Sequence, residues 1–597
     1  MAEVFLPQKA IVTSRDDGAL ILASPYELTS AVSRTADWLD HWGLVKCDSV
    51  FIAERSGDGW RSLTYGETLD TVKVLAESLL GMGLGVSQPL MLLSGKSINH
   101  ALLVLAAQYV GIPFVAVAEQ YSLVTAAHDK LQHALSVIQP KAIFVEDSQK
   151  FSAALNCTLL SNLPVIVAHG QGAYTMEGLK KGDNSIDLEA AKAKVTTDTL
   201  AKLLFTSGST SMPKAVQTTH RMLTTNQAQI AQVWPFLKEH PQRIVDWLPW
   251  NHTFGGSHNF NLMLSTGGSL YLDDGEPSEN GIQRTIENIR MVGQTVSFNV
   301  PIAYSMMVKA MRKDYEFRRQ FFEDLDLVFY AAAAMPPGIW EELKHHAIKE
   351  KGKAPEMSAS WGMTETAPAA LMVHGPMKRA GAIGVPLPGL NAKLLPTKQN
   401  AWELRVKGPN VTDGYYNAPD KTAESFDEEG YLITGDIVRF IDSDEPSNGL
   451  IYDGRLAEDF KLLTGTWVQV SKVRTTAVNA LSPLVKDLVI CGHNKSEVGA
   501  LAFVDQVSLQ KLEPNLEDYD GALVGDKLRA TLLDGLKQFN EGGSSMRIMR
   551  LIVLVDGPSL PRGEITLKGN LNQKLLLQTR AAWVERLYDD NDRAVIR

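Results

Sequence analysis

Short apolar runs alternate with helix-like patterns through most of the first 390 residues. Strands that alternate with helices predict mainly parallel sheets in α/β layers. At 597 residues the chain is too long for one ordinary domain, so this pattern predicts a large multi-layer α/β region with two parallel-sheet lobes. The strand-like runs are residues 89–93, 142–145, 165–168, 203–205, 244–248 and 327–331, and helical patterns lie at 66–82 and 285–293.

The pattern changes from Trp402 onward. Residues 403–407, 431–433, 437–441 and 450–452 are short strand-like runs separated by turn residues, which predicts a small antiparallel or barrel-like lobe. After Arg455 the chain reads as a compact α+β module of a size typical for a domain.

Composition excludes some classes of partner. The net charge is −10 and acidic and basic residues are interspersed without a long basic run, so nucleic acid is not an expected partner. Cys47, Cys157 and Cys491 lack metal-ligand spacing, and so few cysteines favour a reduced cytosolic protein.

A membrane segment is not expected. Residues 101–118 are long and apolar enough to raise the question, with only Gln108 plainly polar, but Pro113 interrupts them. A core helix to Val110 followed by a buried strand at 114–118 fits this stretch better. The start of the chain shows no signal peptide, so we expect a cytoplasmic protein, as a monomer or a homodimer.

The run Thr206 to Lys214 follows a strand-like stretch and combines five small hydroxyl residues with one Gly and one Lys. Small residues let backbone N–H groups approach an anion, hydroxyls add donors and Lys214 adds positive charge. The run therefore predicts a polyphosphate-binding loop. It is not a P-loop, because the required Gly and Lys spacing is missing, and the alternative is a Ser/Thr-rich surface loop.

Three further motifs follow in order: Ser360-Trp361-Gly362-Met363-Thr364-Glu365, Thr434-Gly435-Asp436 and Asp453-Gly454-Arg455. Together with the loop, they resemble the motifs of the adenylate-forming superfamily of acyl-CoA synthetases, luciferases and adenylation domains. Without that context, Trp361 could be a core residue, and the two Gly-containing motifs could be turns. Ser211 stands where the superfamily usually has Gly.

The resemblance implies an ATP site. Trp361 stacks on adenine, Thr364 donates to a phosphate oxygen, Glu365 ligates Mg²⁺, and Asp436 and Arg455 reach the ribose. A run of small residues, 331–334, matches a segment beside adenine, and its alternative is a tightly packed strand end. The implied ATP contacts are Thr206, Ser207, Gly208, Ser209, Thr210, Lys214, Ala333, Trp361, Gly362, Asp436 and Arg455.

The resemblance also implies two units, an N-terminal adenylation core of residues 1–454 and a small mobile C-terminal domain of residues 455–597 that carries a catalytic lysine. The boundary rests on the motif at Asp453–Arg455. Residues 563–574 contain two lysines, of which Lys568 is the better match and Lys574 the competitor. Ala457 stands where the superfamily usually has Asp or Lys as a hinge, and a small residue can also absorb a backbone rotation.

Residues 362–368, 404–416 and 458–468 are similar to the feruloyl-CoA synthetase branch. This implies an ATP-dependent acid:CoA ligase for a hydroxycinnamate or another aryl acid, with Thr364, Glu365, Lys568 and His252 as catalytic residues. His252 could instead be a core or capping residue. The implied acyl pocket is Phe254, Gly255, Val300, Tyr304 and Ala332, and the implied CoA contacts are Lys461, Gly465 and Trp467.

The implied reaction forms an acyl-adenylate and then a CoA thioester. Two alternatives stay open: a ligase for another aryl or medium-chain acid, and a nucleotide-binding homologue without turnover, which the departures at Ser211 and Ala457 motivate.

Overall fold

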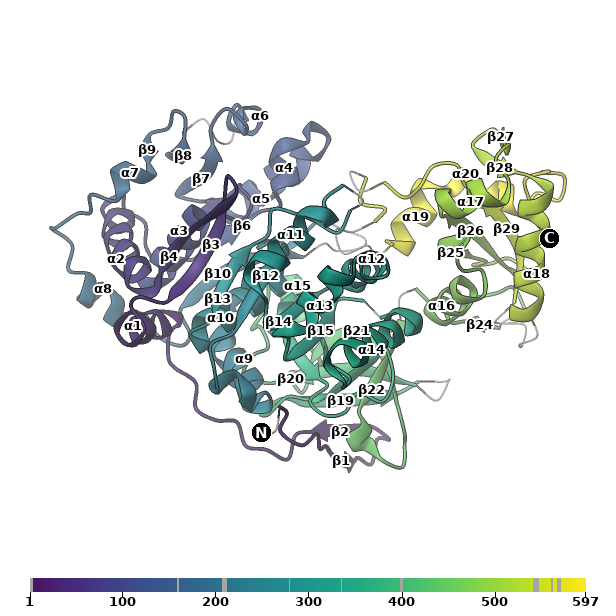
Figure 1. Cartoon of the computed structure of the whole chain (residues 1–597), viewed down its shortest axis with the longest axis horizontal. Helices are drawn as coiled ribbons and strands as arrows, with labels where there is room; N and C mark the ends of the chain where they lie inside the picture. Colours follow the sequence, from purple (N-terminus) through teal and green to yellow (C-terminus); the bar gives the residue numbers. More distant parts are fainter. Residues whose placement is uncertain are drawn as a thin grey trace.

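The structure is a computed structural model (Figure 1). It describes residues 4–157, 160, 162–206, 212–278, 280–333, 335–397, 401–456, 458–464, 466–540, 547–559, 562–565 and 571–597, except for the side chains of Ala126 and Gln538. Several residues singled out above lie outside this description, and for them the sequence-based expectations stand alone: Ser207, Gly208, Ser209, Thr210, Ser211, Ala334, Ala457, Gly465 and Lys568.

A sheet of seven described strands forms the first lobe. From β10 to β9 its neighbouring strands run parallel, and β11 closes one edge in antiparallel direction. Successive residues of β5 face different cores, since Leu90 and Leu92 pack in one cluster and Met91 in another. The strand order is β11 (Lys214–Thr219), β10 (Leu200–Thr206), β6 (Phe114–Ala116), β5 (Leu90–Leu92), β7 (Ala142–Asp147), β8 (Val165–His169) and β9 (Tyr174–Thr175).

Helix α3 (Ile98–Tyr109) is buried along its whole length. It packs on α2 (Tyr65–Gly81) and contacts β6 as well as β3, which belongs to a neighbouring sheet. The expected core helix and following strand at 101–118 are therefore present as α3 and β6. The neighbouring sheet has the order β12 (Arg243–Asp246), β13 (Ser269–Leu272), β3 (Val50–Ser56) and β4 (Gly59–Thr64).

Local signals set the ends of the helices that border these sheets. Thr64 and Glu67 form a capping box at the start of α2, and the Thr219 side chain accepts from Met222 N at the start of α9 (His220–Val233). The other principal helices before residue 360 are α1 (Thr35–Val45), α5 (His128–Ile138), α10 (Phe260–Thr266), α11 (Ile282–Val292), α12 (Pro301–Met311), α13 (Tyr315–Glu323) and α14 (Pro337–Lys351).

The second parallel lobe continues directly into the predicted antiparallel lobe. Strands β14, β15 and β16 run parallel, and β17 and β18 connect them to further antiparallel strands. A single sheet of eleven described strands therefore contains both the parallel and the antiparallel part. The order is β1 (Ile11–Ser14), β2 (Leu20–Ala23), β19 (Asn391–Pro396), β20 (Trp402–Lys407), β21 (Leu432–Phe440), β22 (Leu450–Arg455), β18 (Ala382–Pro386), β17 (Ala369–Met372), β16 (Glu356–Gly362), β15 (Leu327–Ala331) and β14 (Val296–Asn299).

One strand prediction was wrong. Residues 431–433 and 437–441 were expected as two strands, but β21 runs through both. Gly435 has a φ of 72°, and the register against β20 shifts nearby, between Glu403 and Arg405. A glycine at positive φ lets the strand bulge instead of ending in a turn.

The C-terminal residues have hydrophobic clusters of their own and gather at the right of Figure 1. Strands β25 (Val485–Cys491), β26 (Val498–Val504) and β29 (Ile548–Val553) form a sheet beside α16 (Val470–Ala480), α18 (Asp526–Phe539), α19 (Gln573–Thr579) and α20 (Ala581–Leu587). The α/β class with a smaller α+β part is thus confirmed. The boundary between residues 454 and 455 stays a prediction; it falls one residue before β22 ends.

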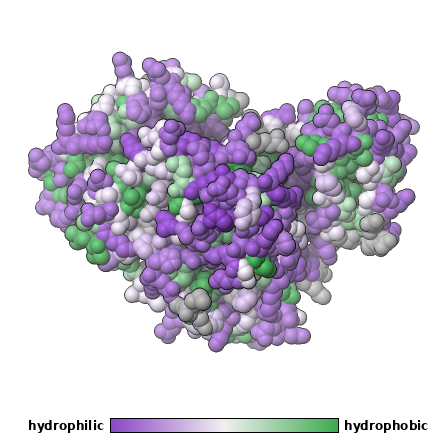
Figure 2. Space-filling view, viewed as in Figure 1, coloured by the Kyte–Doolittle hydropathy of each residue, from purple (hydrophilic) through white to green (hydrophobic). Residues whose placement is uncertain are grey.

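The described helices offer no candidate for a membrane span, because none of them is both long enough and apolar enough. On the face drawn in Figure 2, hydrophilic residues predominate and hydrophobic ones lie in small scattered groups.

Gly384 provides a test of the junction between the two parts of the large sheet. It has a φ of 79°, and a Cβ there would lie 2.0 Å from the backbone of Met372 on β17. Gly384→Ala should therefore lower the thermal unfolding midpoint more than Gly381→Ala, whose φ of 82° is similar but whose Cβ would meet nothing within 4 Å. The positive φ alone costs about 1–2 kcal/mol. Equal losses in the two variants, measured by circular dichroism, would contradict the proposed clash.

Candidate active site

The two ends of the predicted polyphosphate loop lie side by side. Thr206 ends β10 and Lys214 begins β11, and these two residues are partners in the antiparallel ladder. The Thr206 hydroxyl donates to the Lys214 carbonyl at 3.4 Å. The intervening residues therefore connect two neighbouring strand ends at one edge of the first sheet.

Lys214, Tyr415 and Glu365 meet at the base of this loop. The Lys214 ammonium lies 3.9 Å from the centre of the Tyr415 ring, and the Tyr415 hydroxyl donates to Glu365 Oε1 at 2.8 Å. Glu365 lies in a 3₁₀ turn, η5 (Thr364–Thr366), directly after β16. The structure thus brings together Lys214 and Glu365, which the sequence analysis assigned to the same nucleotide.

Tyr415 was missed by the sequence analysis. It belongs to a segment, residues 412–416, that was used only as evidence of resemblance. Main-chain bonds join this segment to β11, from Gln217 N to the Gly414 carbonyl at 3.1 Å and from Tyr416 N to the Ala215 carbonyl at 2.8 Å. No local pattern reveals a contact between residues that are fifty positions apart in the chain.

Burial shifts the ionisation of this cluster. Glu365 is only 4% exposed, and burial raises the pKa of its carboxyl group, while the Tyr415 hydrogen bond and the Lys214 charge lower it. Burial also lowers the pKa of Lys214, against the effect of Glu365. Within the described residues no three His, Cys, Asp or Glu side chains converge on a metal position. A single buried carboxylate still fits Mg²⁺, which takes one or two carboxylates together with phosphate oxygens and water.

Trp361 and Asp436 form a second buried pair. The Trp361 indole N–H donates to Asp436 Oδ2 at 2.9 Å, and the two side chains lie on β16 and β21. Arg455 Nε lies 3.2 Å from Oδ1, in ion-pair contact, but no described donor is aligned to hydrogen-bond this buried oxygen. Burial raises the pKa of Asp436, while Arg455 and Trp361 lower it. Asp436 Oδ1 therefore has the capacity to accept a hydroxyl donor.

The structure gives a steric reason why position 362 is a glycine, which the motif alone did not give. A Cβ there would lie 1.9 Å from the Pro368 carbonyl oxygen, so the backbone after β16 folds back tightly over this residue. Thr364, at the start of η5, is half-buried beside Glu365.

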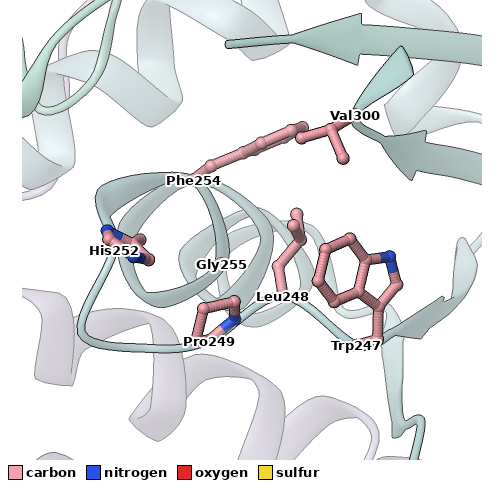
Figure 3. Close-up of a pocket in the computed structure, with 7 residues that line it drawn as sticks. All are labelled: Trp247, Leu248, Pro249, His252, Phe254, Gly255 and Val300. Atoms are coloured by element: carbon pink, nitrogen blue, oxygen red, sulfur yellow. The ribbon is translucent and has the colours of Figure 1, made fainter. Parts of the chain in front are cut away.

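An apolar recess contains four of the residues predicted to contact the acid: His252, Phe254, Gly255 and Val300. Trp247, Leu248 and Pro249 complete its lining (Figure 3). Phe254 and Gly255 begin η4 (Phe254–Asn259), a π-helix, and Val300 follows β14. The free volume of about 10 Å³ is at the lower limit for one water molecule. An aromatic ring can enter this apolar recess only if lining side chains move.

Two other residues predicted for the acid lie elsewhere. Tyr304 does not line the apolar recess. It is fully buried on α12, and its hydroxyl lies within hydrogen-bond distance of the Ser297 and Phe329 carbonyls, at 2.7 and 2.8 Å. Ala332 is exposed and has a φ of 73°, which is strained for a residue with a Cβ. Ala333, predicted to lie beside adenine, is half-buried next to it.

Two of the three residues predicted to contact CoA, Lys461 and Trp467, meet in a hairpin of the C-terminal region, whereas Gly465 lies outside the described residues. Lys461 on β23 (Phe460–Lys461) pairs with Trp467 on β24 (Trp467–Val468), and the Lys461 ammonium lies 5.2 Å from the centre of an indole ring that is 39% exposed. Lys574 is exposed in the first turn of α19. For Lys568, only the flanking residues are described: Ile565 and Leu571 form a β-bridge.

These features describe an α/β protein with a partly buried Lys–Tyr–Glu cluster at the ends of two strands, and comparison with known sequences identifies its class. A model of the family described as AMP-binding enzyme matches residues 39–416. The chain therefore belongs to the AMP-binding enzyme family, which confirms the resemblance to adenylate-forming enzymes.

Individual relatives are distant. The chain is 27% identical to a malonate–CoA ligase of Arabidopsis thaliana over 51% of this chain and 50% of the relative. It is 26% identical to the probable 4-coumarate–CoA ligase 3 of Dictyostelium discoideum over 64% of this chain and 66% of the relative. The match thus covers less than two thirds of either relative. The crystal structure of the anthranilate CoA ligase AuaEII superposes with a TM-score of 0.74 over 94% of this chain and 99% of that one, at 18% identity, which supports the fold.

The Trp361–Asp436 pair generates a test of the nucleotide site. In Trp361→Phe the hydrogen bond to the carboxylate is lost, which raises the pKa of Asp436 further. Bonds to charged groups contribute about 1.5–3 kcal/mol, so ATP affinity should fall roughly 10- to 100-fold. Because a ribose hydroxyl needs the ionised carboxylate, the loss should grow as pH falls. Calorimetric titration with ATP at several pH values measures this, with Trp402→Phe, on β20, as the control. An unchanged affinity in Trp361→Phe at every pH would contradict a role of this hydrogen bond in nucleotide binding.

Proposed function

We propose that the protein is an ATP-dependent acid:CoA ligase that forms an acyl-adenylate and then a CoA thioester. One observation carries the proposal most strongly: the buried Glu365 carboxylate, held by Tyr415 beside Lys214, lies at the base of a hydroxyl-rich loop. A nucleoside triphosphate with Mg²⁺ would match this arrangement, with its phosphates beside Lys214 and its metal ion beside Glu365.

In this proposal the loop from Thr206 to Lys214 binds the departing pyrophosphate, and Thr364 donates to a phosphate oxygen. Asp436 accepts from the ribose, with Arg455 beside it, while Ala333, Trp361 and Gly362 border adenine. Glu365 would hold Mg²⁺, which would supply positive charge beside the phosphates. Positive charge from Lys568 stabilises the transferring groups, as preorganised electrostatic stabilisation does in other enzymes.

The acid is proposed to enter the apolar recess with its carboxylate near His252. The lining presents aromatic and aliphatic groups. This supports an apolar or aromatic acid such as ferulate over an acid that carries a second charged group. The relatives act on different acids by name, malonate and 4-coumarate, so they support acid:CoA ligation more than any one substrate. A ligase for another aryl or medium-chain acid is the alternative within this class.

The second step is proposed to use the C-terminal region. Rotation of residues 455–597 would withdraw Lys568 and present the β23–β24 hairpin, with Lys461, Gly465 and Trp467, to CoA. The exposed ammonium and indole groups of the hairpin suit a ligand that combines phosphates with an adenine ring.

The product pattern tests the proposal. With a suitable acid, ATP should yield AMP and pyrophosphate, not ADP, and CoA should then yield a thioester. Ferulate and 4-coumarate should have a higher kcat/KM than acetate and palmitate, because the aromatic and aliphatic lining favours an aromatic acid once its side chains have moved to admit the ring. Chromatography of nucleotides and thioesters over this panel decides the question. ADP with acyl phosphate would refute the reaction type, whereas faster use of palmitate would refute only the aryl substrate. Nucleotide binding without turnover on any acid would favour the non-catalytic alternative.

The two half-reactions test the role of Lys568. Lys568→Ala should reduce acid-dependent pyrophosphate exchange about 10²- to 10³-fold, the usual effect of losing a preorganised electrostatic contact. It should still convert supplied acyl-adenylate and CoA at a near-normal rate, because the lysine is then withdrawn. Gly465→Leu should show the reverse pattern. Lys574→Ala is the matched control, and normal exchange in Lys568→Ala with lost exchange in Lys574→Ala would assign the role to Lys574.

A further inference from the structure

The π-helix η4 forms one side of the apolar recess and is held from behind by two buried polar side chains. π-Helices are rare, and single π-turns occur frequently at functional sites. Lys202 on β10 donates from Nζ to the Gly256 carbonyl and to Ser257 Oγ, both at 2.8 Å. Gln227 on α9 donates from Nε2 to the Ser257 carbonyl at 3.3 Å. Two neighbouring carbonyls of η4 thus accept from side chains of other elements.

Lys202 is an unusual group to find in this position. It is 1% exposed, and none of the described acidic side chains forms an ion pair with it. Burying an ammonium group without a counter-ion is costly unless its protons are hydrogen-bonded. Burial lowers the pKa of Lys202 to about 7, and a neutral amine retains two protons for the same two acceptors. Among the described residues, the ammonium of Lys202 therefore has its hydrogen bonds with η4, and it also lies 5.3 Å from the centre of the Phe114 ring.

Both donors belong to the unit that carries the polyphosphate loop. Lys202 precedes Thr206, the last residue of β10, on the same strand. Gln227 lies in α9, which begins directly after β11. The strand before the loop and the helix after it are therefore both bonded to η4.

η4 is also in tight contact with residues 248–250, of which Leu248 and Pro249 line the apolar recess. A Cβ on Gly255 would lie 2.8 Å from the Leu248 carbonyl oxygen, and one on Gly256 would lie 2.3 Å from that of Trp250. Any shift of η4 that moves it away from Lys202 must therefore change its packing against residues 248–250, and Phe254 and Gly255 would move with it (Figure 3).

We propose that Lys202 and Gln227 are positioning residues that fix η4, and with it the apolar recess, relative to the polyphosphate loop. The inference rests on the proposed function, in which the acid enters this recess and reacts with a nucleotide bound at the loop. Both side chains act through η4, by hydrogen bonds to the Gly256 and Ser257 carbonyls and to the Ser257 hydroxyl. Their loss should affect the acid far more than ATP.

The test uses Lys202→Met and Gln227→Leu in the full chain. The matched control is Gln108→Leu, which removes a buried Gln on α3 that accepts from Thr35 Oγ1 at 3.1 Å, away from η4. Hydrogen exchange of peptides covering residues 254–260 should accelerate at least tenfold in the first two variants and not in the control. In pyrophosphate exchange the KM for the acid should rise at least tenfold, while the KM for ATP stays within twofold.

The outcomes separate the two proposals. Unchanged exchange at residues 254–260 in Gln227→Leu, the milder variant, would refute the attachment of η4 even if Lys202→Met failed to fold. Faster hydrogen exchange at residues 254–260 with an unchanged KM for the acid would refute the positioning role. A lower kcat with an unchanged KM for the acid would refute it as well. If the unmodified protein activates no acid of the panel, the proposed function fails. The hydrogen-exchange measurement still decides whether Lys202 and Gln227 hold η4.

Discussion

The second edge of β11 determines how the site is assembled. One edge of this strand pairs with β10, and the other bonds to residues 412–416, which lead from the large antiparallel sheet. This junction joins the first lobe to the second. It places Tyr415 over Lys214 and in hydrogen-bond contact with Glu365, although these three residues come from distant parts of the sequence. The predicted loop, the carboxylate after β16 and the carboxylate on β21 share one region of the molecule because β11 has two partners.

Much of the fold follows from local pattern. Apolar runs bounded by helices identified β5, β7, β8, β10, β12 and β15, because a strand buried on both faces is apolar at most of its positions. The interruption at Pro113 correctly separated α3 from β6. The break expected at Gly435 was wrong, since a glycine at positive φ serves a turn and a bulge equally well. The sequence could not distinguish them, because pairing with β20 and β22 decides between the two.

The site was predictable in its residue types and less so in its contacts. The resemblance assigned Lys214 and Glu365 to one ligand, and both contact Tyr415 in the structure. It also assigned His252, Phe254, Gly255 and Val300 to the acid, and these four residues line one recess. Trp361 is bonded to Asp436, a contact that stacking on adenine does not imply. Tyr415 and Lys202 were not predicted as site residues, because their significance depends on partners that approach only in the folded chain. Lys202 interrupted an apolar strand in the sequence, and that interruption was the available signal.

Burial moves three ionisable groups of the site toward neutrality. It raises the pKa values of Glu365 and Asp436 and lowers that of Lys214. A cation at Glu365 and hydroxyl donors at Asp436 favour the ionised carboxylates, so binding them releases protons from whatever fraction is protonated. Phosphate beside Lys214 favours the ammonium, so its binding takes protons up. The two effects have opposite sign, and in the proposed function a nucleotide with its metal would engage both at once. Proton release at the carboxylates and proton uptake at Lys214 would then partly cancel.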